Sequence, residues 1–273
     1  MCGRYVMARA TSDLVALGDA ETNEELVLRQ SWNVAPTAEV PILVAHADDV
    51  GAGVTRRIHV ARWGLVPPWA KELSVGSRAF NARSETVASK PTFRAAVRAR
   101  RCAVPVEGYY EWKTPEPGAK GPDGRAAKKQ PYYVHPAGAG DGEGPVIWFA
   151  GLYEWWQDPE AKAAGEDAWV LSTTILTMAA PDADDDDPVL AALGRLHDRL
   201  PVPMDAETMG RWLAPDTLGS AEEADALVGE VCAGAYDVAA GWSLRPVGGA
   251  VGNVRNNGPE LIQEMREQQG TLL

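Results

Sequence analysis

The sequence predicts one α+β domain, residues 1–273, with a mostly antiparallel, barrel-like mixed β core flanked by short helices. Apolar residues recur with a period of two in several short runs, and few stretches show the longer helical period. The connections between these runs are irregular, and neither a repeat nor a linker divides the chain. Such strands with few long helices are typical of a folded-over sheet. A chain of 273 residues, 45% of them hydrophobic, can bury the core this requires.

The first element expected is a short helix at 12–17, after a Thr-Ser-Asp sequence typical of a helix start. Helical spacing returns at 93–100, 190–196 and 224–231. The segment 114–130 is rich in proline, glycine and lysine and predicts a long exposed hairpin loop. Apolar alternation or short apolar runs predict strands at 41–45, 57–63, 102–112, 132–135, 146–152 and 168–174.

Composition argues against several classes of protein. No stretch approaches the roughly 20 apolar residues of a membrane helix, and the N-terminus lacks a secretory signal. Three cysteines without CxxC spacing argue against a disulfide framework and against a zinc site. We therefore expect a soluble cytoplasmic monomer that needs no membrane, metal or cofactor.

The formal net charge of −12 disfavours a nucleic-acid partner, but the charge is unevenly distributed. Residues 182–187 form an acidic block, which we expect to begin a solvated helix and to face away from any phosphate groove. Residues 78–113 carry more basic than acidic side chains. Local fields decide where a phosphate backbone binds, although a solvated helix face is the commoner role of such a run.

Cys2 is the most informative residue, because it directly follows the initiator methionine. Removal of Met1 would leave Cys2 with an α-amine beside its thiol. This amine has a typical pKa of about 7.7–8.0, against about 10.4 for lysine, so it is far more often nucleophilic at neutral pH. It condenses with aldehydes to a Schiff base, on which the thiol can close a thiazolidine ring. From its position alone, a cysteine at residue 2 that occurs there by chance is as good an interpretation as a reactive N-terminal cysteine.

Glu111 and His197 are candidates for proton transfer. Glu111 lies among aromatic residues of a predicted strand, where desolvation would raise the pKa of a carboxyl group. An exposed strand glutamate paired with Lys113 is an equally good interpretation. His197 enters a proline-punctuated loop after the predicted helix at 190–196, and loops carry function disproportionately. A structural role for His197 remains the commoner one.

Polar and aromatic side chains near 63–83 suggest contacts with a nucleic acid. Asn81 could orient a nucleophile, and Arg83 could bind a phosphate. The rigid turn at 63–69 presents tryptophans, including Trp69, in a chain with ten tryptophans against three phenylalanines. Exposed indoles can stack on bases, although buried anchoring is commoner.

Together these segments resemble the SOS-response-associated peptidase (SRAP) family, whose members act at abasic sites in DNA. The resemblance covers essentially the whole chain. The segments that carry it, in family order, are 1–5 (MCGRY), 32–37 (WNVAPT), 63–67 (WGLVP), 81–86 (NARSET), 108–113 (GYYEWK), 197–201 (HDRLP) and 251–256 (VGNVRN).

The resemblance implies a covalent thiazolidine crosslink between Cys2 and the abasic sugar of single-stranded DNA, in the DNA damage or SOS response, in the cytoplasm or on the nucleoid. It implies that Asn81 positions Cys2, and that Glu111 and His197 move protons. Trp69 would wedge against the base stack at a strand–duplex junction. Other DNA contacts are expected from Arg4, Asn33, Arg83, Thr173 and Arg199.

Two rival functions fit the same residues. In an N-terminal-nucleophile (auto)peptidase, Cys2 would attack an amide and Asn81 would stabilise the oxyanion. In a non-catalytic binding module, the groove would recognise damaged single strands without chemistry. Replacement of Cys2 by alanine separates binding from covalent chemistry.

Overall fold

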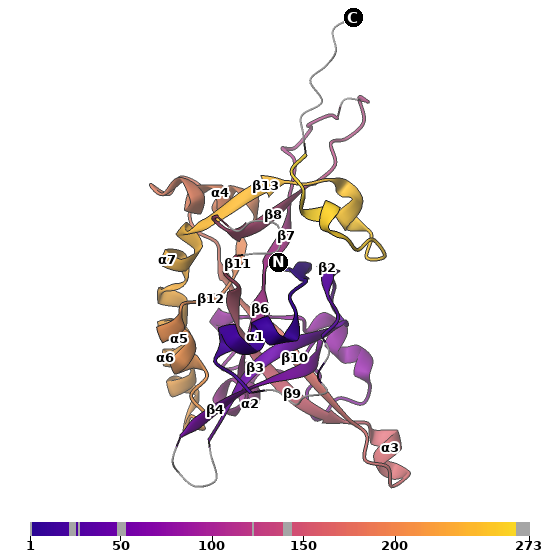
Figure 1. Ribbon diagram of the computed structural model, residues 1–273, viewed down its shortest axis with the longest axis vertical. Helices are drawn as coiled ribbons and strands as arrows, with labels where there is room; N and C mark the ends of the chain where they lie inside the picture. Colours follow the sequence, from indigo (N-terminus) through magenta and orange to yellow (C-terminus); the bar gives the residue numbers. More distant parts are fainter. Residues whose placement is uncertain are drawn as a thin grey trace, which may run out of the picture.

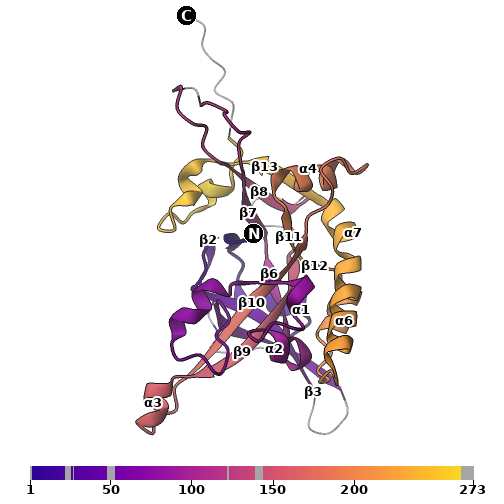
Figure 2. The same ribbon diagram turned by 180° about the vertical axis from the view of Figure 1, so that it is seen from behind.

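The structure is a computed structural model that describes residues 2–21, 26, 28–47, 53–121, 123–138 and 144–265. Its strands form two sheets, and its helices are short (Figure 1). The longest, α6 (Ala221–Ala233), runs with α5 (Ala206–Trp212) and α7 (Ala235–Ala240) along one side of the molecule, as both views show (Figures 1 and 2).

Five strands close into a barrel at the centre of the fold. In ring order they are β10 (Trp169–Ala179), β4 (Val54–Trp63), β3 (Glu39–Ala47), β6 (Arg101–Val106) and β9 (Ile147–Gln157), which pairs again with β10. The β10–β4 contact is parallel, and the other four are antiparallel. The predicted α+β fold with a mixed, barrel-like core is therefore confirmed.

A second sheet lies at one end of this barrel. Its strand order is β13 (Trp242–Pro246), β8 (Gln130–Pro136), β7 (Gly108–Lys113), β1 (Tyr5–Met7) and β2 (Ser31–Val34), and every pairing is antiparallel. Because only one residue separates β6 from β7, the strand predicted at 102–112 is divided between the two sheets. The N-terminal segment of the chain thus enters the molecule where the sheets meet (Figure 1).

The remaining elements are short. Those that the sequence predicted are α1 (Thr11–Gly18), α2 (Arg94–Ala99) and α4 (Pro188–Leu196). The Thr-Ser-Asp sequence does not cap α1, because the helix begins at Thr11 after Ala10, which has no side-chain cap. Those too short for a periodic pattern are β5 (Asn81–Arg83), β11 (Arg199–Pro201), β12 (Pro203–Met204), α3 (Pro159–Ala163), and the 3-10 turns η1 (Leu73–Arg78), η2 (Ser84–Thr86), η3 (Gly249–Gly252) and η4 (Pro259–Ile262).

Several sequence expectations are borne out and two boundaries are wrong. The segment 114–130 joins the antiparallel strands β7 and β8, as predicted. Asp187 caps α4 by accepting hydrogen bonds from the N–H groups of Val189 and Leu190, so the acidic block does begin a helix. The strand predicted to end at 152 instead continues to Gln157, where it pairs with the first residues of β10 as a two-stranded ribbon. The strand predicted to end at 174 continues to Ala179, where it pairs with β5 and β11.

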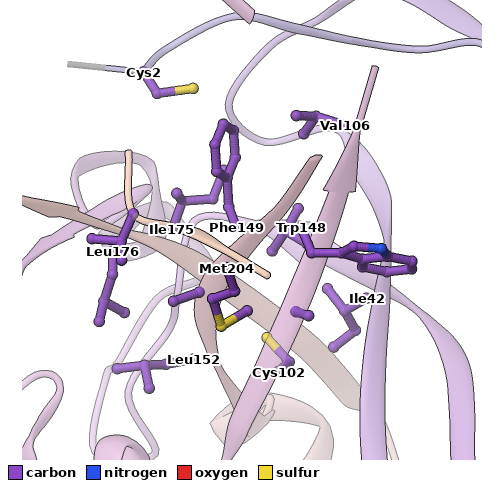
Figure 3. Packing of buried hydrophobic residues seen from close by; sticks show 14 of the residues in the cluster. Cys2, Ile42, Cys102, Val106, Trp148, Phe149, Leu152, Ile175, Leu176 and Met204 are labelled. Atoms are coloured by element: carbon purple, nitrogen blue, oxygen red, sulfur yellow. The ribbon is translucent and has the colours of Figure 1, made fainter. Parts of the chain in front are cut away.

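The barrel is filled by apolar side chains of all its strands, and β6 is buried at every position. Figure 3 shows part of this cluster, with the Cys2 side chain at its edge and Cys102 farther from that edge. In the described part of the chain, no helix is long and apolar enough to cross a membrane.

Candidate active site and nucleic-acid groove

Cys2 is fixed against the barrel by a residue distant in sequence. Its side chain is fully buried. Asn81, the first residue of β5, donates a hydrogen bond from Nδ2 to the carbonyl oxygen of Cys2 at 2.7 Å. β5 itself pairs with the barrel strand β10, with Asn81 opposite Ile175. The position of the Cys2 backbone is therefore tied to the barrel wall.

The thiol of Cys2 lies in an environment that keeps it protonated. Burial, and after it the negative charge of Glu111, raises the pKa of this thiol to about 12. Glu111 lies on β7, which pairs with the strand that follows Cys2, and the residue is 6% exposed. The interpretation of Glu111 as an exposed strand glutamate is therefore wrong. Its Oε1 accepts a hydrogen bond from the backbone N–H of Trp112 at 3.1 Å.

Glu111 opens onto a hollow of about 520 Å³, which we call the Glu111 hollow. Its size is within the range of about 300–1,000 Å³ that is typical of ligand sites. The structure thus brings Glu111 and His197 together from distant parts of the sequence, beside two arginines. The lining residues are Phe80, Arg83, Glu111, Trp112, Lys129, His197, Asp198 and Arg199.

His197 is held at the end of α4, which it caps. Its Nδ1 accepts a hydrogen bond from the backbone N–H of Arg199 at 2.9 Å and lies 2.7 Å from a carboxylate oxygen of Asp198. These contacts conflict, because an Nδ1 that accepts from an N–H cannot donate to a carboxylate. The Asp198 side chain is 85% exposed and can rotate, whereas the backbone N–H is fixed. We therefore assign the proton of neutral His197 to Nε2.

Arg199 is bound by a carboxylate. Its Nη1 and Nη2 contact the two carboxylate oxygens of Glu85 at 2.5 and 2.9 Å, and Nη2 also donates to the backbone oxygen of Thr177 at 2.7 Å. The hydrogen bond from Arg199 lowers the pKa of Glu85. Arg83 lies in the same place, since it pairs with Thr177 across β5 and β10.

Arg4 and Asn33 form a second polar cluster behind Trp112. Nη1 of Arg4 donates to Asn33 Oδ1 at 2.9 Å and to the backbone oxygen of Val251 at 2.8 Å. The guanidinium carbon lies 6.0 Å from the centre of the Trp112 ring. Burial lowers the pKa of Arg4.

Asn33 is buried, and its amide is engaged by protein groups. Its Nδ2 donates to the backbone oxygens of Asn253 and Asn256 at 3.0 and 2.8 Å. This residue therefore orients Arg4 and the segment after η3, and both of its N–H donors are used within the protein. The DNA contact expected of Asn33 stays a prediction, which its engagement within the protein does not favour.

Thr173 does not reach the groove. Its side chain is fully buried, and its hydroxyl donates to the backbone oxygen of Leu152 at 2.9 Å and lies 3.5 Å from Cys102 Sγ. Thr177, four residues farther along β10, is the threonine beside Arg83 and Arg199. No sequence pattern distinguishes the two threonines, because the choice depends on the register of two short parallel strands.

Trp69 is 62% exposed, whereas the segment around it is anchored. Ala70 and Val66 pack on the buried Trp156, whose Nε1 donates to the Ala70 backbone oxygen at 2.8 Å. The indole of Trp69 is therefore presented by a rigid turn. Trp69 is not among the residues that line the Glu111 hollow, so the structure does not bring it together with Glu111 and His197.

Sequence reasoning missed three groups at the site. Tyr5 and Tyr109 are buried, and burial raises the pKa of both; the negative charge of Glu111 raises the pKa of Tyr109 further. Lys129 reaches the Glu111 hollow from the long loop before β8. Among the described residues, no three histidine, cysteine or acidic side chains gather as ligands for a metal ion.

Comparison with known proteins identifies the family of this chain. Residues 1–254 match the family model described as SOS response associated peptidase (SRAP). "Abasic site processing protein YoqW" of Bacillus subtilis is 30% identical over 96% of this chain and 99% of its own length. "Abasic site processing protein HMCES" of Rattus norvegicus is 27% identical over 85% of this chain and 64% of its own length.

The fold is also shared with a solved structure. A crystal structure of a protein from Bacteroides thetaiotaomicron superimposes with a TM-score of 0.69 and 20% identity, over 97% of this chain and all of the other. At this identity the likeness concerns the fold alone. The sequence match across both sheets is broader, and the chain belongs to the SOS response associated peptidase (SRAP) family.

Proposed function

We propose that this protein processes abasic sites in single-stranded DNA and bonds covalently to them through Cys2, after Met1 is removed. The observation that carries the proposal is the position of Cys2. Its backbone is bound by Asn81, its thiol lies in the field of Glu111, and Glu111 shares a hollow with His197 and two arginines. The names of the relatives support the substrate.

The chemistry begins with the aldehyde that an abasic sugar exposes when its ring opens. The α-amine of Cys2 adds to C1′ of this aldehyde to give a carbinolamine, which loses water to form a Schiff base. The Cys2 sulfur then adds to C1′, and the thiol proton ends on the nitrogen, closing a thiazolidine ring. One water is released in all, and neither an oxidant nor a reductant is consumed.

Glu111 and His197 are suited to the proton transfers of this sequence. Ring opening moves a proton from the C1′ hydroxyl to the ring oxygen, and loss of water needs a proton on the leaving hydroxyl. Glu111 borders both Cys2 and the hollow, and the proton of His197 is on Nε2, on the far side of the ring from the Arg199 backbone contact. We assign Glu111 to ring opening and His197 to the carbinolamine.

A neutral thiol suits this order of events. A thiolate in the resting protein would compete with the amine and oxidise readily. Burial favours the protonated form of the Cys2 thiol, which suits an order in which the amine reacts first and the thiol then adds to the Schiff base.

The test mixes purified protein, shown by mass spectrometry to begin at Cys2, with single-stranded DNA that carries one abasic site. We expect a band on a denaturing gel without added reductant. Cys2→Ala should bind the DNA but give this band only after borohydride traps the Schiff base. Absence of the band with correctly processed protein would refute the crosslink and leave the peptidase and plain-binding functions to be tested.

A further inference from the structure

Two histidines of the β3–β4 hairpin contact each other away from the site described above. Nε2 of His46 on β3 lies 3.2 Å from Nε2 of His59 on β4. The ring centroids are 5.4 Å apart and the ring planes are inclined by 63°. Because the centroids are much farther apart than the nitrogens, the rings face each other through these nitrogens. Neither histidine lines the Glu111 hollow, so the pair is separate from the chemistry of Cys2.

The hairpin holds the two histidines in place. Every residue of β3 pairs with a residue of β4, and in this register the pair of Val44 and Arg57 lies between His46 and His59 on the same face. Val44 is buried, whereas both histidines are partly exposed. The imidazoles therefore meet above a closed sheet, with their other side towards solvent.

Both imidazoles are neutral at neutral pH. Burial, and after it the charge of Arg57, lowers the pKa of His46. Burial also lowers the pKa of His59, with further contributions from His46 and Arg57. In the metal-free protein one Nε2 carries a proton and donates a hydrogen bond to the other. A neutral imidazole is also the form of histidine that binds a metal ion.

The distance between the two nitrogens selects among metal ions. Two nitrogens bound to one zinc ion at about 2.0–2.1 Å lie about 3.3–3.4 Å apart when the angle at the metal is tetrahedral. They would lie about 2.9 Å apart at the right angle of a square-planar or octahedral ion. The observed 3.2 Å is closer to the tetrahedral value. Mg²⁺ and Ca²⁺ are disfavoured in any case, because they prefer oxygen ligands.

We propose that His46 and His59 are the protein ligands of a zinc site on the solvent side of this hairpin. Zinc takes the place of the proton between the two Nε2 atoms. That proton moves through solvent to Nδ1 of the same ring, so no net proton is released. Among the described residues, no third histidine, cysteine or acidic side chain joins the pair. Two positions of a tetrahedral ion therefore remain for water or for a ligand from another molecule.

Arg57 is the unfavourable group at this site, because its positive charge acts on both histidines and repels a cation. Its Nε lies 3.8 Å from a carboxylate oxygen of Glu21, and both side chains are exposed. Solvent and Glu21 therefore screen part of this repulsion. Removal of Arg57 should strengthen zinc binding, an effect opposite to that of removing either ligand.

The experiment titrates the protein with zinc chloride at neutral pH and follows binding by calorimetry. All variants are made in a Cys2→Ala background, because the amine and thiol of an N-terminal cysteine bind zinc themselves. The test variants are His46→Gln and His59→Gln, with Arg57→Gln as the variant of opposite sign. The matched control is His197→Gln, which removes an imidazole from the Glu111 hollow.

We expect the Cys2→Ala protein to bind one zinc ion, and excess zinc to raise its midpoint of urea unfolding. Each test variant loses one of two ligands and should bind zinc at least about tenfold more weakly. Arg57→Gln should bind it several-fold more tightly, and the control should equal the Cys2→Ala protein. Unfolding midpoints without zinc show that the variants are folded.

Absence of zinc binding by the Cys2→Ala protein would overturn the inference, and so would unchanged binding by either test variant. Equal weakening in His197→Gln would assign the ion to the Glu111 hollow and overturn it too. The proposed function fails or stands separately, because the crosslink requires Cys2 whereas zinc binding is measured without it.

Discussion

The side-chain amide of Asn81 donates a 2.7 Å hydrogen bond to the backbone carbonyl of Cys2, across 79 residues of sequence. The other end of this amide, Oδ1, is buried and has no hydrogen-bond partner in the described part of the chain. A buried acceptor without a donor costs free energy. The α-amine that appears when Met1 is removed belongs to the same residue that Asn81 binds, and we expect it to supply that donor.

Asn81→Ala should therefore slow crosslinking by at least about tenfold without preventing it, because Cys2 loses its orientation and keeps its chemistry. Single-turnover rates on abasic single-stranded DNA measure the effect. Asn81→Asp is the informative comparison: it keeps an acceptor for the amine and loses the donor to the carbonyl. A rate for Asn81→Ala equal to that of the parent would contradict an orienting role.

The ion pair of Arg199 and Glu85 predicts opposite effects of two substitutions on DNA binding. Arg199→Gln removes a cation beside the Glu111 hollow and should weaken non-covalent binding about tenfold, with a smaller salt dependence. Glu85→Gln removes a negative charge that competes with phosphate for the same guanidinium, so binding should tighten several-fold. Fluorescence anisotropy over a salt series gives both values. Weaker binding by Glu85→Gln would show instead that Glu85 is needed to orient Arg199.

The buried thiols predict a loss of stability at alkaline pH. Burial raises the pKa of Cys102 from 9.0 to about 12, and that of Cys2 is raised as far. Above pH 9 the unfolded chain releases these protons while the folded chain keeps them. The free energy of unfolding is therefore unaffected by these thiols below pH 9, and it falls as the pH rises towards 12. Each thiol contributes a slope of up to about 1.4 kcal/mol per pH unit.

Urea unfolding between about pH 8 and 11 measures this slope, and Cys102→Ala provides the control. That variant loses packing, so its stability at the lowest pH is reduced, but its slope in the alkaline range should be shallower by the share of one thiol. An identical slope in both proteins would show that Cys102 titrates normally in the folded state.

Elements that depend on neighbouring residues could be predicted from the sequence, whereas those that depend on contacts between distant residues could not. Local patterns predicted α1, α4 and the β7–β8 hairpin, because helical spacing, strand alternation and turn composition depend on neighbouring residues. The sequence predicted a barrel-like core, but it did not predict that the pairing of β9 with β10 closes the barrel. The continuation of β9 from 153 to Gln157 depends on its pairing with β10, which leaves no local signal in the sequence of β9.

The candidate site shows the same limit. Cys2, Glu111 and His197 could be proposed from their residue types and motifs. That Thr177 rather than Thr173 lies beside Arg83 depends on the parallel register of β5 and β10, which the sequence does not reveal. The contact of Arg4 with Asn33 likewise depends on the placement of the segment after η3, which is 220 residues from Asn33 in the sequence. Neither contact has a sequence pattern of its own.

Trp69 separates binding from stability more cleanly than the buried residues of the site do. Its indole is 62% exposed while the neighbouring Ala70 is anchored by Trp156, so Trp69→Ala should leave the midpoint of urea unfolding unchanged. If the indole stacks on a base, its removal should weaken binding by about 1–3 kcal/mol.

If Trp69 acts as a wedge at a strand–duplex junction, the weakening should be larger on DNA with a duplex beside the lesion than on a plain single strand. Trp169→Ala, at a similarly exposed tryptophan on β10, is the matched control. Equal weakening in both variants on both DNAs would assign the effect to general surface hydrophobicity and remove Trp69 from the DNA-contacting surface.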